Sequence, residues 1–205
     1  MIINELKEKV LCFERNDLPH KWLNNKLVLP IAEDIIYNKL NKLNKLWITR
    51  HKAENNEKYK QLIPYIVLYT NDKKIVCYQR KGIEKRLEEY WSIGIGGHIH
   101  QTDETNVNIL NTIKNCCIRE ISEEIKSIND FSSLRFIAVI NDEYTQVGKH
   151  HLGLLYLLNI KDIIKITTNN EISNFNLSNK TEIINYNLET WSIISIRYIV
   201  NNNII

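Results

Sequence analysis

The sequence predicts an α+β fold, because segments with the pattern of β-strands alternate with two helical segments in the order strands, helix, strands, helix. The strand segments are apolar runs bounded by polar residues, and they lie at residues 46–50, 62–69, 75–80, 90–95, 134–140 and 151–158. Apolar residues at helical spacing mark the helices, at residues 107–128 and 186–199. This order is that of an α+β protein or of a sandwich around a mixed sheet.

Length and composition indicate one domain, or one domain with an extension. The chain has 205 residues, of which 43% are hydrophobic, and its four Trp, ten Tyr and four Phe suffice for a real core. The formal net charge of +3 is small, and lysines are interspersed with acidic residues. The charge therefore gives no general case for binding nucleic acid or a membrane surface.

The N-terminus and the cysteines favour a cytoplasmic protein. Charged residues interrupt residues 1–16, so this stretch is not a signal peptide, and no run approaches the ~18 apolar residues of a membrane span. Cys12, Cys77, Cys116 and Cys117 have the spacing of neither a zinc site nor a disulfide framework. We expect reduced and mostly buried thiols.

Residues 1–45 resemble an extension added to a domain of residues 46–205. The sequence predicts a short strand at 9–13, a turn at 17–19 and a helix over 31–46. No chemistry is recognisable in this extension, and packing or a subunit contact is its expected role.

The larger part begins with a predicted hairpin, formed by strands 62–69 and 75–80 around the polar link 70–74. Loops are predicted where polar residues dominate, at residues 51–60, 141–150 and 167–181, the last being a loop or a mobile segment. The strand before the main helix leads into Gly96 and Gly97. Glycines permit positive φ and a close approach of the backbone to a ligand.

The main helix carries the densest chemistry of the chain. Its apolar stripe is predicted to be buried and consists of Val107, Leu110, Ile113, Cys117, Ile121 and Ile125 or Ile128. Glu120, Glu123 and Glu124 share another face, where like charges at this spacing cost a helix about 0.2–0.5 kcal/mol per pair. A cation among them would reverse that cost, and Mg²⁺ prefers oxygen ligands of this kind.

The pattern Gly97-x5-Asp103, followed by Arg119-Glu120-Ile121-x-Glu123-Glu124, resembles the box of the Nudix (MutT-like) hydrolases. That box is written G-x5-E-x7-R-E-U-x-E-E-x-G-U, with U an aliphatic residue. The likeness extends to a branch of predicted MutT-like phosphoesterases through residues 59–65, 78–80, 91–99, 151–153 and 191–192. The resemblance implies the Nudix-type α/β/α sandwich with a mixed central sheet.

Three features depart from the family pattern. Residues 104–118 separate Asp103 from Arg119 by fifteen residues, against seven in the box, and the first acid is Asp103 instead of Glu. Lys126 replaces the closing Gly that normally ends the helix, so the helix is expected to run on or to end with a different cap. These departures bear on loop geometry and substrate more than on the metal.

The resemblance implies a Mg²⁺ site, with Mn²⁺ as an alternative, held by Glu120, Glu123, Glu124 and the carbonyl of Gly97. Arg119 is implied to orient a Glu, and one Glu of the box or of a loop is implied to be the general base. The implied catalytic residues are therefore Arg119, Glu120 and Glu123. Taken alone, such a motif is usually a solvated face whose ion pairs contribute under about 1 kcal/mol.

Further residues are candidates for contacts with a substrate diphosphate. They are the cations Arg50, Lys60 and Arg80, the imidazole of His98 and the carboxylate of Glu143. Each cation taken singly is better explained as a surface residue, and a structural role explains His98 equally well. Glu143 follows strand 134–140, where several family members place an extra carboxylate, and a surface Glu explains it at least as well. His150 and His151 begin a strand and lack the spacing of metal ligands.

The resemblance implies a metal-dependent hydrolase that cleaves the phosphoanhydride bond of a nucleoside diphosphate linked to another moiety. Its partner would be this small molecule, with neither nucleic acid nor membrane, and a homodimer is compatible by analogy with the family. The alternative is a Nudix-fold binding or regulatory module without turnover, against which the intact residues 119–124 argue. The Pro that the ADP-sugar branch carries after the box is absent, and the substrate stays open.

Overall fold

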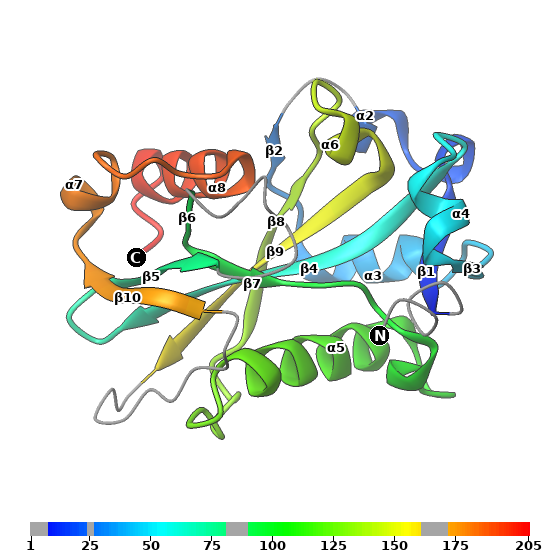
Figure 1. Cartoon of the computed structure of the whole chain (residues 1–205). Helices are drawn as coiled ribbons and strands as arrows, with labels where there is room; N and C mark the ends of the chain where they lie inside the picture. Colours follow the sequence, from blue (N-terminus) through cyan, green and yellow to red (C-terminus); the bar gives the residue numbers. More distant parts are fainter. Residues whose placement is uncertain (1–7, 24–26, 81–89, 161–171) are drawn as a thin grey trace. The chain divides into compact units, whose positions relative to one another are not determined.

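The computed structural model describes residues 8–23, 27–80, 90–160 and 172–205, and all structural statements refer to these ranges. Two compact units emerge, and each takes up several stretches of the chain. Unit 1 comprises residues 1–64, 96–117 and 136–155, and unit 2 comprises residues 65–95, 118–135 and 156–205. Strands and helices occur in both units, so the predicted α+β class is confirmed (Figure 1).

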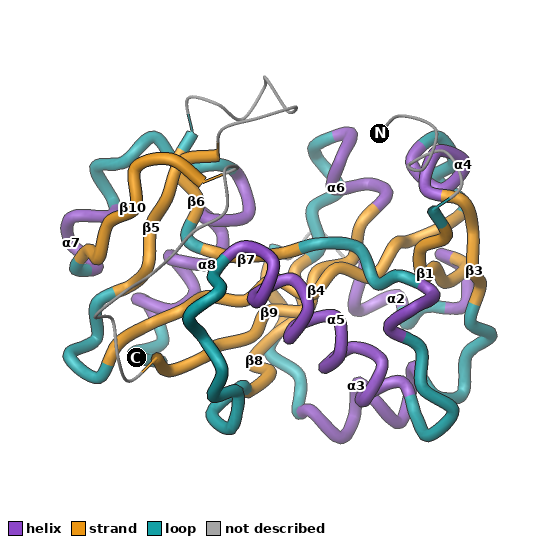
Figure 2. The backbone as a smooth tube through the Cα atoms, turned by 60° about the horizontal axis from the view of Figure 1, so that its bottom comes forward, coloured by secondary structure: helices purple, strands orange, loops and turns teal. Residues whose placement is uncertain are grey.

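Hydrogen bonding joins the strands into one sheet, with the order β10-β5-β4-β9-β8-β2 along its main path. Figure 2 draws the strands in orange. The strands on this path are β10 (Ile172–Ser178), β5 (Ile75–Arg80), β4 (Tyr59–Thr70), β9 (His151–Ile160), β8 (Arg135–Ile140) and β2 (Val28–Leu29). In this order β5 and β4, and likewise β9 and β8, are consecutive strands of the chain, whereas the other neighbouring pairs are not.

In unit 1, β1 (Lys9–Glu14) confirms the strand predicted at the N-terminus. It pairs antiparallel with β3 (Leu46–Thr49), where Val10 faces Ile48, and then with the start of β4, where Phe13 faces Lys60. Val10 and Cys12 are fully buried and pack with Ala53. The N-terminal strand therefore contributes to the same hydrophobic cluster as residues 46–59.

Short helices connect the strands of unit 1. They are η1 (Arg15–Asp17), α2 (His20–Leu23), α3 (Glu33–Leu40), α4 (Arg50–Glu54), η3 (Gln101–Asp103) and α6 (Gln146–His150). The prediction of loops at 51–60 and 141–150 was wrong where α4 and α6 form. In α6 the reason is local: the hydroxyl of Thr145 accepts a hydrogen bond from the amide of Gly148 and caps the first turn.

In unit 2, the hairpin between β4 and β5 is confirmed, with Tyr69 facing Ile75 across an antiparallel pair. Lys73 in its turn has φ of 64°, a left-handed conformation. The strand β10 pairs antiparallel with β5, so the predicted loop was wrong for residues 172–178. This strand is mostly polar and its register shifts between Ser173 and Asn176, which removes the simple alternation that marks a strand in sequence. Residues 167–171 of that prediction lie outside the described residues.

The main helix is α5 (Ile109–Glu124), and its buried positions are Ile109, Ile113, Cys116, Cys117 and Ile121, followed by Ile125 just after the helix. Val107, predicted to be buried, precedes the helix and is 75% exposed. The helix ends at Glu124 although Lys126 replaces the family's glycine. The amide of Ile125 still donates to the carbonyl of Ile121, at 2.7 Å.

The last helix of unit 2, α8 (Thr190–Asn201), follows β6 (Trp91–Ser92), β7 (Gly94–Gly96) and α7 (Lys180–Ile183) along the chain. Glu189 caps it, because its carboxylate accepts from the amides of Trp191 and Ser192 and from the hydroxyl of Tyr65. The ring of Tyr65 passes so close to Gly94 that a Cβ at this position would collide with it. Position 94 therefore needs glycine for space.

Candidate active site

Arg119 organises the acidic face of α5. Its Nη1 donates to Oε1 of Glu120 at 2.7 Å and reaches Oε2 of Glu123 at 3.4 Å, one helical turn further on. The Glu120 side chain is 12% exposed and that of Glu123 is 57% exposed. The guanidinium therefore fixes the less exposed carboxylate firmly and the more exposed one loosely.

Glu124 ends the helix and is half-buried, and its Oε2 atom is buried. Removing a carboxylate oxygen from water is costly unless a donor or a cation compensates for the lost hydration. Three carboxylates and one guanidinium give residues 119–124 a formal charge of −3 + 1 = −2. The acidic face of α5 therefore carries excess negative charge and partly desolvated oxygen atoms, which fits a hard divalent cation.

Among the described residues, no group of three or more His, Cys, Asp or Glu side chains is arranged as a ready-made metal site. Such a cage is not what Mg²⁺ requires, since it commonly takes one or two carboxylates, waters and substrate phosphates. Glu120 and Glu124, the two less exposed carboxylates, match that requirement. Glu123 is exposed and lies beside Arg119.

Gly97 follows β7 and is half-buried in unit 1, whereas Glu120, Glu123 and Glu124 belong to unit 2. Ligation of a metal by the Gly97 carbonyl stays a prediction. The residue after it, His98, is held by its own backbone, because its carbonyl accepts from the thiol of Cys116 at 3.5 Å. The helix α5 thus anchors the segment that carries the glycines.

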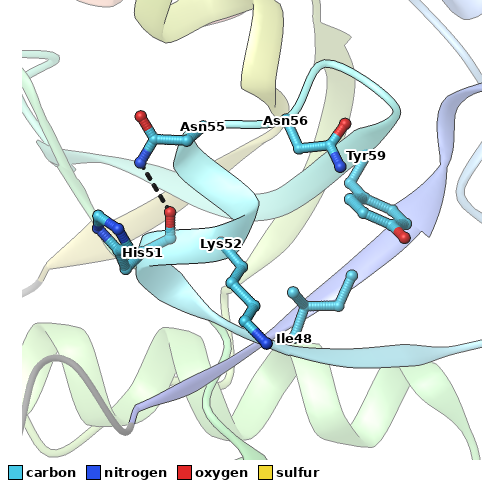
Figure 3. A pocket seen from close by; sticks show the side chains of 6 residues that line it. All are labelled: Ile48, His51, Lys52, Asn55, Asn56 and Tyr59. Carbon is cyan, nitrogen blue, oxygen red and sulfur yellow. Dashed lines mark hydrogen bonds between the residues drawn. The ribbon is translucent and has the colours of Figure 1, made fainter.

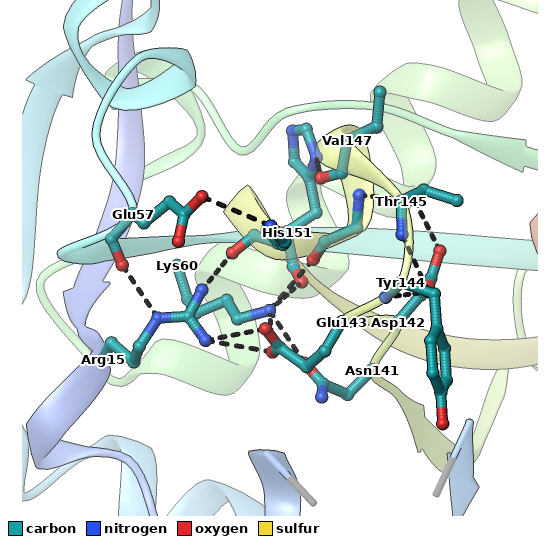
Figure 4. A network of polar contacts seen from close by, with 12 residues as sticks. Arg15, Glu57, Lys60, Asn141, Asp142, Glu143, Tyr144, Thr145, Val147 and His151 are labelled. Carbon is teal, nitrogen blue, oxygen red and sulfur yellow. Dashed lines mark hydrogen bonds and ion pairs between the residues drawn. The ribbon is translucent and has the colours of Figure 1, made fainter. Parts of the chain in front are cut away.

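Glu143 lies in a charged cluster of unit 1, formed with Arg15 and Lys60 (Figure 4). Arg15 Nη1 donates to both carboxylate oxygens, at 3.0 and 2.9 Å, and Lys60 Nζ lies 2.7 Å from Oε1. Arg15 also donates to the backbone carbonyls of Glu57 and Lys149. The carboxylate predicted as a substrate contact is therefore occupied by two cations of the protein itself.

Lys60 is fully buried and surrounded by acceptors. Besides Glu143, its ammonium donates to Oδ1 of Asn141 at 2.8 Å and to the carbonyls of Gly148 and His151 at 2.9 and 3.1 Å. Burial lowers the pKa of Lys60 to about 8, although Glu143 opposes this shift. A lysine so enclosed does not reach a diphosphate in this arrangement, so the structure argues against that interpretation.

The pKa of Glu143 is also set by burial and by its charged neighbours, which act in opposite directions. Burial alone would raise it, but Lys60 and Arg15 together hold the pKa below its ordinary value. The carboxylate is thus a weak proton acceptor in this state. A role for Glu143 as general base needs the cluster to rearrange.

Arg50 and Arg80 are the two arginines predicted to contact a substrate, and the structure describes the side chain of Arg50 alone. Arg50 begins α4, where its Nε donates to Glu54 Oε1 at 2.8 Å and its Nη1 lies 3.8 Å from Glu8 Oε2. Arg80 ends β5, and its side chain lies outside the described part of the structure. Contacts of either residue with a substrate stay predictions.

His98 meets His151, the first residue of β9, in unit 1. Their Nε2 atoms are 3.4 Å apart, and the ring centroids are 5.4 Å apart at an interplanar angle of 61°. Burial lowers the pKa of His151 to about 4, and the carbonyl of Val147, 2.6 Å from its Nδ1, opposes the shift. His151 is therefore neutral at physiological pH, and its proton resides on Nδ1.

A depression of about 440 Å³ lies beside α4 in unit 1 (Figure 3). It is lined by Ile48, His51, Lys52, Asn55, Asn56 and Tyr59. No residue of the predicted metal site or substrate contacts lines this depression. The side chain of Asn55 is already turned to the carbonyl of His51, at 2.8 Å.

Sequence reasoning missed Arg15 and the pairing of His98 with His151. Arg15 is 128 residues from Glu143, and the two histidines are 53 residues apart. No spacing in the chain links either pair. One signal was present in the sequence. Lys60 lies at the start of a strongly apolar strand, and a lysine that is buried there needs an acidic partner.

Comparison with known sequences gives a partial match. No protein-family model matches the chain. Protein YmaB of Bacillus subtilis is 34% identical over 115 residues, which amount to 55% of this chain and 55% of YmaB. The match thus spans about half the length of this curated relative.

Comparison with solved structures is more extensive. Tm1382, a proposed Nudix hydrolase, has a TM-score of 0.78 and 25% identity, over 95% of this chain and 99% of that one. The Nudix domain of Shewanella oneidensis NrtR, complexed with ADP-ribose, has a TM-score of 0.55 and 15% identity, over 76% and 99%.

A third solved structure, from Francisella tularensis, contains AMP and a manganese ion. It is a bifunctional NMN adenylyltransferase/ADP-ribose pyrophosphatase with a TM-score of 0.53 and 16% identity, over 70% of this chain and 42% of that one. These neighbours define the fold as that of the Nudix proteins, which confirms the predicted sandwich architecture. The chain is thus similar in fold to Nudix hydrolases, in agreement with the resemblance that the residues around Arg119 carry.

Proposed function

We propose that the protein is a metal-dependent Nudix hydrolase that cleaves the phosphoanhydride bond of a nucleoside diphosphate linked to another moiety. The observation that carries this proposal is the Arg119–Glu120 pair at 2.7 Å on a helix face with two further glutamates. The similarity in fold to Nudix hydrolases supports a hydrolase of pyrophosphate bonds. The small-molecule substrate and the metal are the parts that this proposal adds.

The proposed metal ligands are Glu120, Glu123, Glu124 and the carbonyl of Gly97, with Mg²⁺ as the ion and Mn²⁺ as its alternative. An ion bound by these residues would neutralise charge on the diphosphate and would lower the pKa of a water molecule bound to it. The manganese ion in the Francisella tularensis neighbour supports a divalent cation in this fold. The buried Oε2 of Glu124 and the low exposure of Glu120 support these residues as the inner pair.

Arg119 and Glu123 have complementary proposed roles. Arg119 holds Oε1 of Glu120 in one orientation. The Glu120 carboxylate is therefore already ordered before the reaction begins. Glu123 is 57% exposed, so its carboxylate is the most accessible to solvent of the three. Arg119, Glu120 and Glu123 are therefore the proposed catalytic residues, while the choice of general base among the glutamates stays open.

The proposed partner is a small diphosphate compound, with no nucleic acid and no membrane, in the cytoplasm. The ADP-ribose bound to the NrtR Nudix domain supports this ligand class. None of the helices in the described ranges combines the length and apolar character needed to cross a bilayer. Residues 1–45 are proposed to be an extension packed on residues 46–205, supported by the pairing of β1 with β3 and β4. A homodimer is compatible with this arrangement.

The test is a panel of nucleoside diphosphate conjugates with Mg²⁺, read as phosphate released after coupling to a phosphatase. We expect turnover by the parent and its loss in Glu120→Gln and Glu124→Gln. Glu33→Gln on the exposed start of α3 is the matched control, which keeps full activity. Binding of these compounds without turnover would instead establish a non-catalytic Nudix-fold module, and equal rates in all variants would remove the glutamates from the mechanism.

A further inference from the structure

The segment that follows the two adjacent glycines is hydrogen-bonded to the N-terminal strand β1 in unit 1. The amide of Leu11 donates to the carbonyl of Ile99 at 2.9 Å, and Val10 forms an antiparallel bridge with His100. The pairing of β1 with β4 covers residues 12–14. The start of β1 is therefore shared between β3 and the segment after the glycines.

A contact between side chains reinforces this backbone pairing. Nε2 of His100 lies 2.8 Å from Oε1 of Glu8, the residue just before β1. The imidazole can donate this hydrogen bond in its neutral form as well as in its charged form, because an ionised carboxylate only accepts. A hydrogen bond to a charged group is stronger than one between neutral groups. Glu8 thus ties His100 to the beginning of β1.

Glu8 is itself anchored to the start of α4. Its carbonyl accepts from the amide of Arg50 at 2.8 Å, and its Oε2 lies 3.8 Å from Nη1 of the same arginine. The next residue, Lys9, faces Thr49 in the register of β1 and β3. The position of the Glu8 carboxylate is therefore determined by the paired strands and by α4, and the segment after the glycines is held against it.

The first half of α5 binds the same segment through further hydrogen bonds. The thiol of Cys116 donates to the carbonyl of His98 at 3.5 Å, and Nδ2 of Asn115 donates to the carbonyl of Asp103 at 3.1 Å. Within the segment, the amide of His100 donates to Oδ2 of Asp103 at 2.9 Å. Residues 98–103 are thus tied both to β1 and to α5.

Gly96 and Gly97 lie just before this tied segment. Glycine has more backbone freedom than any other residue, so holding it in one conformation costs more conformational entropy. The chain reaches these glycines from β7, which pairs with β4. A glycine has no side chain that could anchor it, so the direction of the Gly97 carbonyl depends on what holds the residues on either side.

We propose that Glu8 is a positioning residue of the active site. Through His100, its carboxylate holds residues 98–103 on β1 and thereby fixes the direction of the Gly97 carbonyl. This inference rests on the proposed function, in which that carbonyl is a ligand of the metal. It gives the N-terminal extension a part in the reaction, beyond the packing or subunit contact expected from its sequence.

The first experiment measures hydrogen exchange of single amides by NMR, in the full chain without metal or substrate. Glu8→Ala should speed exchange of the Leu11 and His100 amides by about tenfold, because the segment opens more often once His100 has lost this partner. Glu14→Ala, at the other end of β1, is the matched control: it removes a carboxylate paired with Lys58 and should leave both amides unchanged. Glu8→Gln keeps an acceptor oxygen and should restore most of the protection. Unchanged exchange in Glu8→Ala would overturn the proposal.

The second experiment measures the Mg²⁺ concentration that gives half-maximal turnover of the nucleoside diphosphate conjugates. Glu8→Ala should raise this concentration by about tenfold, as replacing a residue that orients a metal ligand typically does, while Glu14→Ala keeps the value of the parent. Loss of the substrate contact predicted for Arg50 would instead raise KM at saturating Mg²⁺. A raised KM with an unchanged Mg²⁺ requirement would therefore overturn the positioning role. A parent without turnover would refute the hydrolase proposal, and the exchange measurement would still decide whether Glu8 holds the segment.

Discussion

Two charged clusters of this molecule differ in how their charges are balanced. In unit 1, the carboxylate of Glu143 is met by Arg15 and Lys60, and the ammonium of Lys60 has three further acceptors. In unit 2, the single guanidinium of Arg119 serves Glu120 and Glu123, with Glu124 one residue further. The first cluster joins one carboxylate to two cations, whereas in the second one guanidinium is shared by two carboxylates.

The difference agrees with a role in folding for the first cluster and with the ligand-binding role proposed for the second. A buried charge that has lost its partner is strongly destabilising, so the cluster around Lys60 has little freedom to change. Crowded carboxylates on a helix cost stability when no cation is present. Substitutions in the two clusters should therefore act on different quantities: folding in unit 1, metal binding and turnover in unit 2.

The largest effect is expected at the acidic face of α5. Glu120→Gln should lower kcat/KM by about 10²–10⁴-fold, because both a metal ligand and the partner of Arg119 are altered. Without metal, its free energy of unfolding should stay equal or rise slightly, since repulsion among the glutamates decreases. Urea denaturation with and without Mg²⁺ checks this: Mg²⁺ at 100 times its Kd should stabilise the parent by about 2.7 kcal/mol and the variant far less. A variant stabilised as much as the parent would show that Glu120 is no ligand.

The next effect is expected in the cluster of unit 1. Lys60→Met should lower the free energy of unfolding by about 3–5 kcal/mol, because Glu143 loses a buried partner and three acceptors lose their donor. Lys58→Met is the matched control two residues away, where an exposed side chain pairs with Glu14 and the loss should be much smaller. Similar losses in the two variants, measured by urea denaturation, would refute the distinction between the clusters.

The pH dependence of stability sharpens the same comparison. The pKa of Lys60 is about 8 in the folded protein against 10.5 as its ordinary value, so between these values the unfolded chain binds more protons. The free energy of unfolding of the parent, relative to that of Lys60→Met, should therefore rise with pH in this window by up to ~3 kcal/mol. Denaturation curves at pH 8 and pH 10.5 for both proteins measure it. A flat difference would mean that the Lys60 pKa is not lowered.

The Glu143 carboxylate acts in the opposite pH range. Its pKa lies below the ordinary value of 4.5 in the folded protein, so its contribution is present above that value and is lost as the pH falls through the folded pKa. Glu143→Gln should remove this part of the acid dependence. Acid denaturation of the parent and the variant, followed by circular dichroism, tests the sign.

The smallest effect is expected for Arg119→Ala, which should change the free energy of unfolding by under about 1 kcal/mol, since Glu120 and Glu123 belong to the same helix as Arg119. Arg15→Ala should cost more, because its guanidinium also serves two backbone carbonyls in the part-buried cluster. Thermal unfolding of the two variants side by side gives the ranking. A larger loss for Arg119→Ala would mean that α5 is held by this ion pair.

The sequence predicted features whose signal lies within a few residues. The hairpin of β4 and β5 is visible because apolar runs flank a polar turn, and the Arg119–Glu120 pair because its members are adjacent on a helix. The strand β10 was missed because polar residues and a register shift hide its alternation. The helix α6 was missed because five residues carry no periodic pattern, and one cap from Thr145 suffices to form it.

Contacts between distant residues could not be predicted in the same way. Nothing near Glu143 indicates that Arg15 reaches it, and nothing near His98 indicates His151, because the sheet brings these residues together only after folding. The carboxylates of α5 were predicted as a set through local spacing and family resemblance. The proposed participation of Gly97 in a metal site stays a prediction, because local spacing does not determine tertiary arrangement.

The tight approach of Tyr65 to Gly94 has a consequence for how this protein can change over evolutionary time. A side chain at position 94 would collide with a ring whose hydroxyl also binds the carboxylate that starts α8. Gly94 can therefore be replaced only after a smaller residue has appeared at position 65. That first step removes a hydrogen-bond donor to Glu189. The two positions should vary together among descendants of this sequence, with the helix start at 189 changing in the same lineages.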